Sequence, residues 1–244
     1  LDGREIAQSS IRVSGLVKVN TSTGFDTAQL SDTSEAQLDS TAGIAGAFQG
    51  ITCSCDNLGI VENQIEHGRY VKAKAAATVS PQQLLTDCRN TTELKNGNDT
   101  WSRYLLGGNG EAASGGNKIP FSWKPDVAFN KSSGNIPFSK TGACKISLRL
   151  ATDNQFLYGA NANTHTYKIY DLRVEYFTKP QSGSSGLAFE TIHTIKNIAE
   201  SGNTSLATRV PATVQSVSMV FHIDNQLNDA THNHLQLSVP PDVQ

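Results

Sequence analysis

Two segments in the second half of the chain alternate between apolar and polar side chains, and this alternation constrains the fold more than any other feature. Residues 143–151 place on one side Cys144, Ile146, Leu148 and Leu150. Residues 166–177 alternate in the same way, with one change of phase at Tyr170-Asp171. Successive side chains of a β-strand point to opposite faces, so both segments are predicted to be half-buried strands. The change of phase predicts a β-bulge.

The apolar faces of these two strands are expected to meet in a common core. A third alternating segment, residues 213–223, offers further apolar side chains to that core. The side chains that we expect to share it are Ile146, Leu148, Leu150, Leu172, Val174, Val217 and Met219.

The rest of the chain adds further short strands separated by polar loops. The segments that resemble strands are 11–19, 51–56, 119–123, 187–195, 205–210 and 234–239. Helix-compatible stretches are restricted to 61–77 and 81–88, and 95–117 is a loop rich in Gly and Asn. Many short strands without a repeat of fixed period are typical of sandwiches and jelly rolls. The prediction is an all-β, antiparallel jelly-roll sandwich with about eight to ten strands and one or two short helices.

The N-terminal region differs in composition from the rest. Residues 20–40 are rich in Ser, Thr, Asp and Gln, and their large apolar side chains are Phe25, Leu30 and Leu38. Such a segment is too polar to form a core of its own. We therefore divide the chain into 1–40, a strand with a polar arm or loop, and 41–244, the jelly-roll domain. Either the arm docks on a neighbouring subunit, or the segment is a loop that stays on its own subunit.

Charge and motifs exclude several functional classes. The 244 residues carry a net charge of −2 and 17% charged residues, which argues against a strongly basic nucleic-acid surface, and no sequence-specific nucleic-acid partner is expected. The chain contains no Gly-x-Ser-x-Gly, phosphate-loop or His-Glu-x-x-His motif. Glu62 and Glu66, four residues apart, are interpreted as solvated surface. The prediction is a protein that is not an enzyme and needs no cofactor.

Cysteines and histidines are the remaining candidates for chemistry. Cys53 and Cys55 share a face if they lie in a strand and cannot bridge each other, so partly buried free thiols are favoured over disulfides or metal ligands. The candidates for a metal site are His222, Asp224, His232 and His234, whose i, i+2 spacing places pairs on one strand face. Histidines on a surface or an interface are the competing interpretation. Asn-x-Ser/Thr sequons occur at Asn20, Asn90, Asn98, Asn130 and Asn203.

Three segments in sequence order resemble the jelly-roll capsid proteins of icosahedral DNA viruses, the lineage of adenoviruses, virophages, polinton-like viruses and lipid-containing phages. They are Phe121–Asn130, Ile136–Ala151 and Thr166–Phe177. Ile51–Asp56, Gly59–Glu62 and His67–Val71 are similar to the same pattern, in which a strand and a turn lead into a helix that bears a tyrosine.

This resemblance implies a structural subunit of a viral capsid shell in the virion, which self-assembles through sheet edges and loops. Its partners would be copies of itself in a trimer or pentamer, other capsid proteins and a host surface receptor. The resemblance brings no catalytic residues with it. The alternative is a carbohydrate- or receptor-binding β-sandwich domain of a spike or adhesin, and a jelly-roll enzyme with two facing carboxylates is a third class.

Overall fold

The structure is a computed structural model, and the residues that it describes are 3–23, 25, 36–39, 41–78, 118–159, 162–181, 186–194, 213–214, 231–232 and 234–235. Within them the chain is mostly β-structure. The strands are β1 (Arg4–Ile6), β2 (Arg12–Thr21), β3 (Gln37–Leu38), β4 (Phe48–Cys55), β5 (Gly59–Gln64), β6 (Ile119–Trp123), β7 (Ile136–Pro137), β8 (Cys144–Leu150), β9 (Leu157–Tyr158), β10 (His165–Glu175) and β11 (Thr178–Pro180). The helices are α1 (His67–Thr78), α4 (Phe138–Thr141) and α5 (Asp153–Phe156), with short 3-10 turns η1 (Gly43–Ala47), η2 (Ala128–Lys131) and η3 (Ala162–Thr164).

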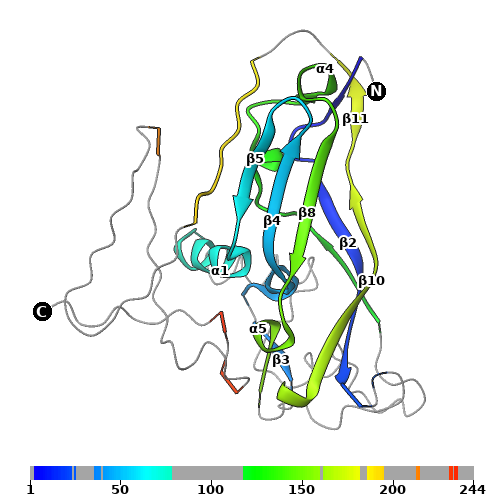
Figure 1. Cartoon of the computed structure of the whole chain (residues 1–244), viewed down its shortest axis with the longest axis vertical. Helices are drawn as coiled ribbons and strands as arrows, with labels where there is room; N and C mark the ends of the chain where they lie inside the picture. The colour runs from blue at the N-terminus through cyan, green and yellow to red at the C-terminus, as the bar shows by residue number, and fades with distance from the viewer. Residues whose placement is uncertain are drawn as a thin grey trace, which may run out of the picture.

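All the strand pairs are antiparallel, which confirms the all-β prediction. The strands form three three-stranded sheets, β10-β2-β6, β5-β4-β8 and β11-β1-β7, and the small pair β3-β9. Figure 1 shows β5, β4 and β8 side by side, with α1 beside the lower end of β5. The predicted strands 11–19, 51–56, 119–123, 143–151 and 166–177 are present as β2, β4, β6, β8 and β10.

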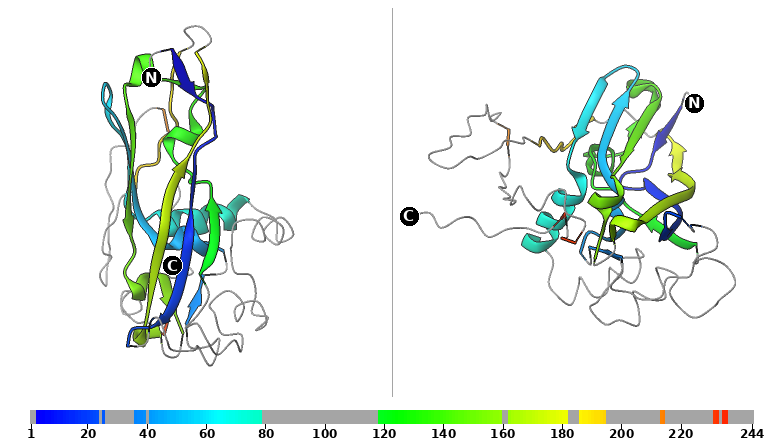
Figure 2. Two further views of the ribbon diagram at one scale, coloured as in Figure 1. Left: turned by 90° about the vertical axis from the view of Figure 1, so that its right-hand side faces the viewer. Right: turned by 60° about the horizontal axis from the view of Figure 1, so that its bottom comes forward.

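The main core lies between the sheets that contain β4 and β2. Val13, Val17 and Val19 of β2 are buried, as are Ile51 and Cys53 of β4. The rings of Phe48 in β4 and Trp123 in β6 stack with centroids 4.9 Å apart and planes at 10°. This stack joins the two sheets directly, and the left view of Figure 2 shows the two layers from the side.

The predicted bulge is present in β10. The register against β2 shifts between Tyr170 and Arg173, and Asp171 takes a positive φ of 49°. Tyr167 lies opposite Val19 before the shift, and Val174 lies opposite Val13 after it. Because Val13 and Val19 both face the core, the bulge keeps the apolar side chains of β10 on one face although their parity in the sequence changes.

The prediction that β8 and β10 share a core is only partly right, because several of the side chains named for it are exposed. Ile146 and Leu148 are half-buried against the core, whereas Leu150, Leu172 and Val174 are 45%, 43% and 41% exposed. Within the described residues β8 pairs with β4 alone and β10 with β2 alone, so both are edge strands whose inward faces are half open. Val217 and Met219 lie outside the described residues.

The helical prediction for 61–77 is wrong over its first part. Residues 59–64 form β5, and α1 begins at His67. Gly59, with φ of 69°, closes a tight turn after β4, and the following backbone pairs with β4 instead of forming a helix. Residues 187–194 are also not a strand, because they form only the isolated bridge between Ser132 and Phe189.

The other predicted helices and strands either differ from the structure or lie outside the described residues. The described residues hold more short helices than the one or two expected. The predicted elements at 81–88, 95–117, 205–210 and most of 213–223 and 234–239 lie outside the described residues. No helix in the described part is long and apolar enough to cross a membrane.

The described residues of the polar N-terminal segment contact their own chain. The ring of Phe25 lies under the ammonium groups of Lys18 and Lys168, at 5.1 and 4.2 Å from its centroid. Leu38 pairs with Leu157 in the β3-β9 ladder. Asp39 binds Lys72 on α1 with a distance of 2.5 Å between Nζ and Oδ2. These contacts favour a loop that stays on its own subunit, while the boundary at residue 40 stays a prediction.

Replacing Phe48 with Ala should test the contact between the sheets. The change removes a fully buried ring and its stack on Trp123, and we expect it to lower the free energy of unfolding by about 3–5 kcal/mol. Urea unfolding followed by tryptophan fluorescence measures this. Ile60→Ala is the control, because Ile60 is 70% exposed and its truncation should cost less than about 0.5 kcal/mol. Equal losses in the two variants would contradict the assigned core.

Candidate functional site

The densest group of interacting polar side chains in the described residues surrounds Asp126, between α1 and the loop after β6. Tyr70 and Lys74 of α1 both donate to Oδ2 of Asp126, at 2.6 Å each. Lys131 lies 3.8 Å from Oδ1 and 3.6 Å from the carboxylate of Glu190. The main-chain oxygen of Asp126 accepts a hydrogen bond from Gln64, at 2.8 Å. The cluster therefore ties α1, β5, η2 and residue 190 together.

The surroundings of Asp126 and Tyr70 shift the pKa values of both side chains away from neutral pH. Burial raises the pKa of Asp126, but hydrogen bonds from Lys74 and Tyr70 and the charge of Lys131 outweigh it, and the pKa lies below its usual value. Burial and the hydrogen bond to Asp126 raise the pKa of Tyr70. A general base needs a pKa near the working pH and an accessible proton to remove. Asp126 instead stays ionised and partnered, an arrangement suited to holding α1 in place.

Glu62 holds a second connection, and the interpretation of Glu62 as solvated surface is wrong. Its side chain is buried, and its two oxygens accept hydrogen bonds from the backbone N–H groups of Ala128 and Ile192, each at 2.7 Å. The register of β5 against β4 shifts between the pairs Ser54–Ile60 and Cys53–Glu62. This shift turns Ile60 outward and Glu62 inward, so the carboxylate reaches two loops that are distant in sequence.

His67, the first residue of α1, lies buried against the core. Its Nδ1 lies 2.5 Å from Oε1 of Gln64, and its ring packs edge-on against Trp123 at 5.1 Å. Nε2 has no hydrogen-bond partner among the described residues. Burial lowers the pKa of His67 to about 4, so the ring is neutral at pH 7.

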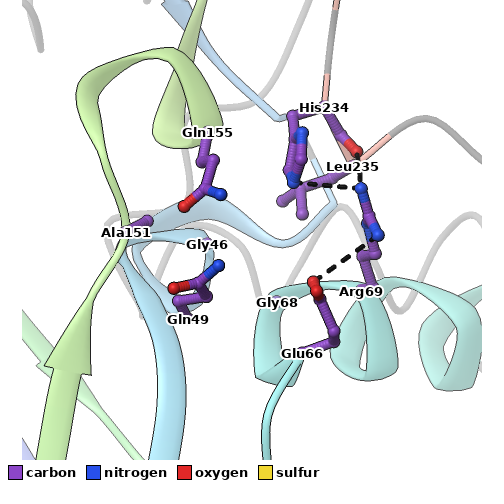
Figure 3. Close-up of a pocket in the computed structure, with 9 residues that line it drawn as sticks. All are labelled: Gly46, Gln49, Glu66, Gly68, Arg69, Ala151, Gln155, His234 and Leu235. Atoms are coloured by element: carbon purple, nitrogen blue, oxygen red, sulfur yellow. Dashed lines mark hydrogen bonds and ion pairs between the residues drawn. The ribbon is translucent and has the colours of Figure 1, made fainter. Parts of the chain in front are cut away.

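A shallow depression lies on the other side of α1, and residues 234–235 fill it (Figure 3). Its lining residues are Gly46, Gln49, Glu66, Gly68, Arg69, Ala151, Gln155, His234 and Leu235. A Cβ atom on Gly46 would lie 3.0 Å from one methyl carbon of Leu235, and one on Gly68 would lie 3.3 Å from the other methyl carbon. The two glycines therefore make room for this leucine, and what remains holds no more than about one water molecule.

Arg69 fixes the neighbouring His234 in this depression. Its Nη2 lies 3.0 Å from Nε2 of His234 and 3.3 Å from the main-chain oxygen of that residue, and Nη1 lies 3.5 Å from Glu66. A guanidinium can only donate, so Nε2 of His234 accepts this hydrogen bond with the lone pair that a metal would need.

The structure describes two of the four candidates for a metal site. His232 is exposed, with Nδ1 3.1 Å from the hydroxyl of Thr231, and His234 is bound to Arg69. His222 and Asp224 lie outside the described residues. Within the described ranges no three His, Cys, Asp or Glu side chains are grouped so that they could hold a metal ion.

Cysteines and sequons in the described residues also have clear positions. Cys53, Cys55 and Cys144 are free thiols, and Cys88 lies outside the described residues. Asn20 and Asn130 are buried, and each uses its side-chain nitrogen as a donor: Asn20 to the main-chain oxygen of Phe25, Asn130 to those of Ile11 and Pro125. The other three sequons lie outside the described residues.

Sequence reasoning missed Asp126, Tyr70, His67 and the buried state of Glu62. Each depends on contacts between segments far apart in the chain; Tyr70 and Asp126, for example, are 56 positions apart. The one local signal was the pair Glu62 and Gln64, because two polar residues at i, i+2 in a strand share a face. Taken together, the site residues described above join structural elements that are far apart in the sequence.

Glu62→Gln should destabilise the fold. A glutamine amide offers one acceptor oxygen, so the N–H of either Ala128 or Ile192 loses its partner and meets an NH₂ group instead. We expect a loss of about 2 kcal/mol in the free energy of unfolding, measured with urea. Glu190→Gln is the matched control, since that side chain is 56% exposed and should cost less than about 1 kcal/mol. Similar losses in both variants would contradict the role given to Glu62.

His67 should make the fold less stable at mildly acidic pH. Its pKa of about 4 in the folded state lies below the ordinary 6.5, so the unfolded chain binds more protons between these values. Stability from this residue is therefore complete above pH 6.5 and falls as the pH drops toward 4. Between pH 7 and pH 5 we expect a loss of about 2 kcal/mol, measured by urea unfolding at both values.

His67→Phe, which keeps a ring but cannot titrate, should remove most of that difference between pH 7 and pH 5. His193→Phe at an exposed position should leave it intact. An unchanged pH dependence in His67→Phe would show that another group is responsible.

Comparison with known proteins adds no family to this picture. No protein-family model, no curated protein and no solved structure matches the chain. The function of this protein is therefore inferred from its own sequence and geometry.

Proposed function

We propose that this chain is a structural subunit of a viral capsid shell, with a jelly-roll topology and without enzymatic activity. It assembles into a trimer or pentamer and contacts other capsid proteins in the virion. The resemblance of its sequence to jelly-roll capsid proteins suggests this role. The observation that carries the proposal is a row of exposed apolar side chains on and just after an edge strand.

This row follows the second half of β10. Leu172 and Val174 are exposed on the inward-facing side, Tyr176 is 48% exposed, and Phe177 is 75% exposed. Leu150 at the end of β8, the edge strand of the other sheet, adds a further exposed apolar side chain. Scattered exposed apolar residues are common, but several that follow one another closely on and after an edge strand are typical of an interaction site.

The chemistry of the row suits contact with another protein. Aromatic side chains such as Tyr176 and Phe177 are enriched among residues that dominate binding energy, because they bury a large area with little loss of freedom. Edge strands β8 and β10 also present backbone groups that a neighbouring strand can use. A chain with many polar uncharged residues and a net charge of −2 adds little like-charge repulsion between copies.

The backbone around Phe177 is held by its own chain, so the ring is presented from a fixed position. The main-chain oxygen of Phe177 accepts a hydrogen bond from the N–H of Ala7 at 2.9 Å, and its own N–H donates to the hydroxyl of Ser10 at 3.3 Å. A preorganised anchor loses less entropy on association than a mobile one.

The test is the mass of the purified chain by light scattering over a range of concentrations. We expect a trimer or pentamer, and we expect Phe177→Asp and Val174→Asp to shift it to monomer while circular dichroism stays unchanged. A charge placed in a buried contact strongly disfavours association, yet costs little on a free surface.

Ile60→Asp is the matched control, because Ile60 is as exposed as Phe177 but lies on the β4–β5 hairpin. It should leave the oligomer intact. A chain that is monomeric at every concentration, or an oligomer that survives both Phe177→Asp and Val174→Asp, would contradict the proposal. Binding of the monomer to a glycan array through Tyr176 and Phe177 would favour the carbohydrate-binding alternative instead.

A further inference from the structure

Two cysteines that are far apart in sequence face each other across neighbouring strands. Cys55, the last residue of β4, is the register partner of Cys144, the first residue of β8. Their sulfur atoms lie 3.6 Å apart, although the two residues are 89 positions apart in the sequence. Both are free thiols in this structure.

The ladder places this pair in the arrangement where side chains come closest. The adjacent pair, Asp56 and Ala143, is hydrogen-bonded, with the N–H of Asp56 donating to the oxygen of Ala143 at 3.1 Å. Hydrogen-bonded and non-hydrogen-bonded pairs alternate along an antiparallel ladder, so Cys55 and Cys144 form a non-hydrogen-bonded pair. The Cα atoms of such pairs lie about 4.5 Å apart, within the range that a disulfide spans.

The backbone on either side of the pair is held from both strands. The carboxylate of Asp56 accepts the N–H of Ala143 at 3.1 Å, and the N–H of Asn57 donates to the oxygen of Thr141 at 3.0 Å. Gly142 has a positive φ of 66°, and a Cβ there would lie 2.9 Å from the Cβ of Asp56. This close approach fixes the separation of the strand ends, so the two sulfur atoms meet without a large movement of the chain.

The remaining described cysteine is placed differently. Cys53 lies opposite Ile146, and it shares one strand face with Cys55, which prevents a bond between the two. Cys144 is half-buried whereas Cys55 is 4% exposed, so a reagent reaches Cys144 first. Burial, followed by the neighbouring Cys144, raises the pKa of Cys55 to about 12, which makes its reaction slow at neutral pH.

We propose that Cys55 and Cys144 are an oxidation site, at which a small-molecule disulfide such as oxidised glutathione forms an intrachain disulfide that locks β4 to β8. The Cys144 thiolate attacks one glutathione sulfur, and one glutathione thiol leaves. The Cys55 thiolate then attacks the Cys144 sulfur of the mixed disulfide, and the second glutathione thiol leaves. The protein loses two electrons and two protons, and the glutathione disulfide gains them.

Incubation of the full chain with oxidised glutathione at pH 8.5, followed by alkylation and peptide mass mapping, tests the site. We expect a peptide that joins Cys55 to Cys144, with Cys53 still alkylated. Dithiothreitol should restore all four free thiols. A link between other cysteines, or a stable glutathione adduct on Cys144 without a link to Cys55, would overturn the proposal.

Thermal unfolding tests the locking of the strands. Closing a long loop restricts the unfolded chain, so the oxidised protein should unfold at a temperature higher by about 5 °C or more, and reduction should reverse the rise. Cys144→Ser, at a half-buried position that tolerates the change, should show no shift after the same treatment. An oxidised chain with an unchanged or lower unfolding temperature would show that the bond does not lock native strands.

Discussion

The stack of Phe48 on Trp123 is the contact on which most of the described structure depends. It sets the distance between the β4 and β6 layers, and it gives the ring of His67 a flat surface to pack against. Because His67 is the first residue of α1, the start of the helix is fixed by the same rings that join the sheets. The position of the Asp126 cluster follows, since Tyr70 and Lys74 stand on the first two turns of that helix. A change in the distance between the sheets would therefore move His67, then α1, and with it the Asp126 cluster at the surface.

Outside the strands, buried polar side chains form hydrogen bonds with the backbone groups that have no strand partner. Glu62 and Asn130 each hold backbone groups of two other segments, so irregular loops are satisfied by side chains in place of a ladder. An unpartnered buried backbone group is costly, and a single side chain with two acceptors or donors removes two such costs at once. This explains how a protein with low apolar content keeps ordered loops around a modest core.

The strands were predictable because their information is local. The alternation in 143–151 and the change of phase at Tyr170-Asp171 identified β8, β10 and the bulge, since parity along a strand decides which face each residue takes. Parity could not show that Leu172 and Val174 face inward at an open edge, because exposure depends on what lies opposite. The same limit applies to the site, because the partners of Glu62 and Asp126 lie far from them in the sequence and no local pattern encodes their approach. At Ile60 and Glu62 the bulge in β5 even reverses the faces that hydropathy indicates.

The two buried sequons bear on how the chain is made. The side-chain nitrogens of Asn20 and Asn130 are the atoms that an oligosaccharide would occupy, and in the folded protein both are already hydrogen-bond donors to the main chain. Glycan transfer in the endoplasmic reticulum acts on chains that are still unfolded, so a sugar added at either position would displace an internal bond and keep the segment from closing. Biosynthesis in a compartment without this machinery avoids the conflict. For recombinant work, a bacterial cytosol is thus a better host than a secretory system.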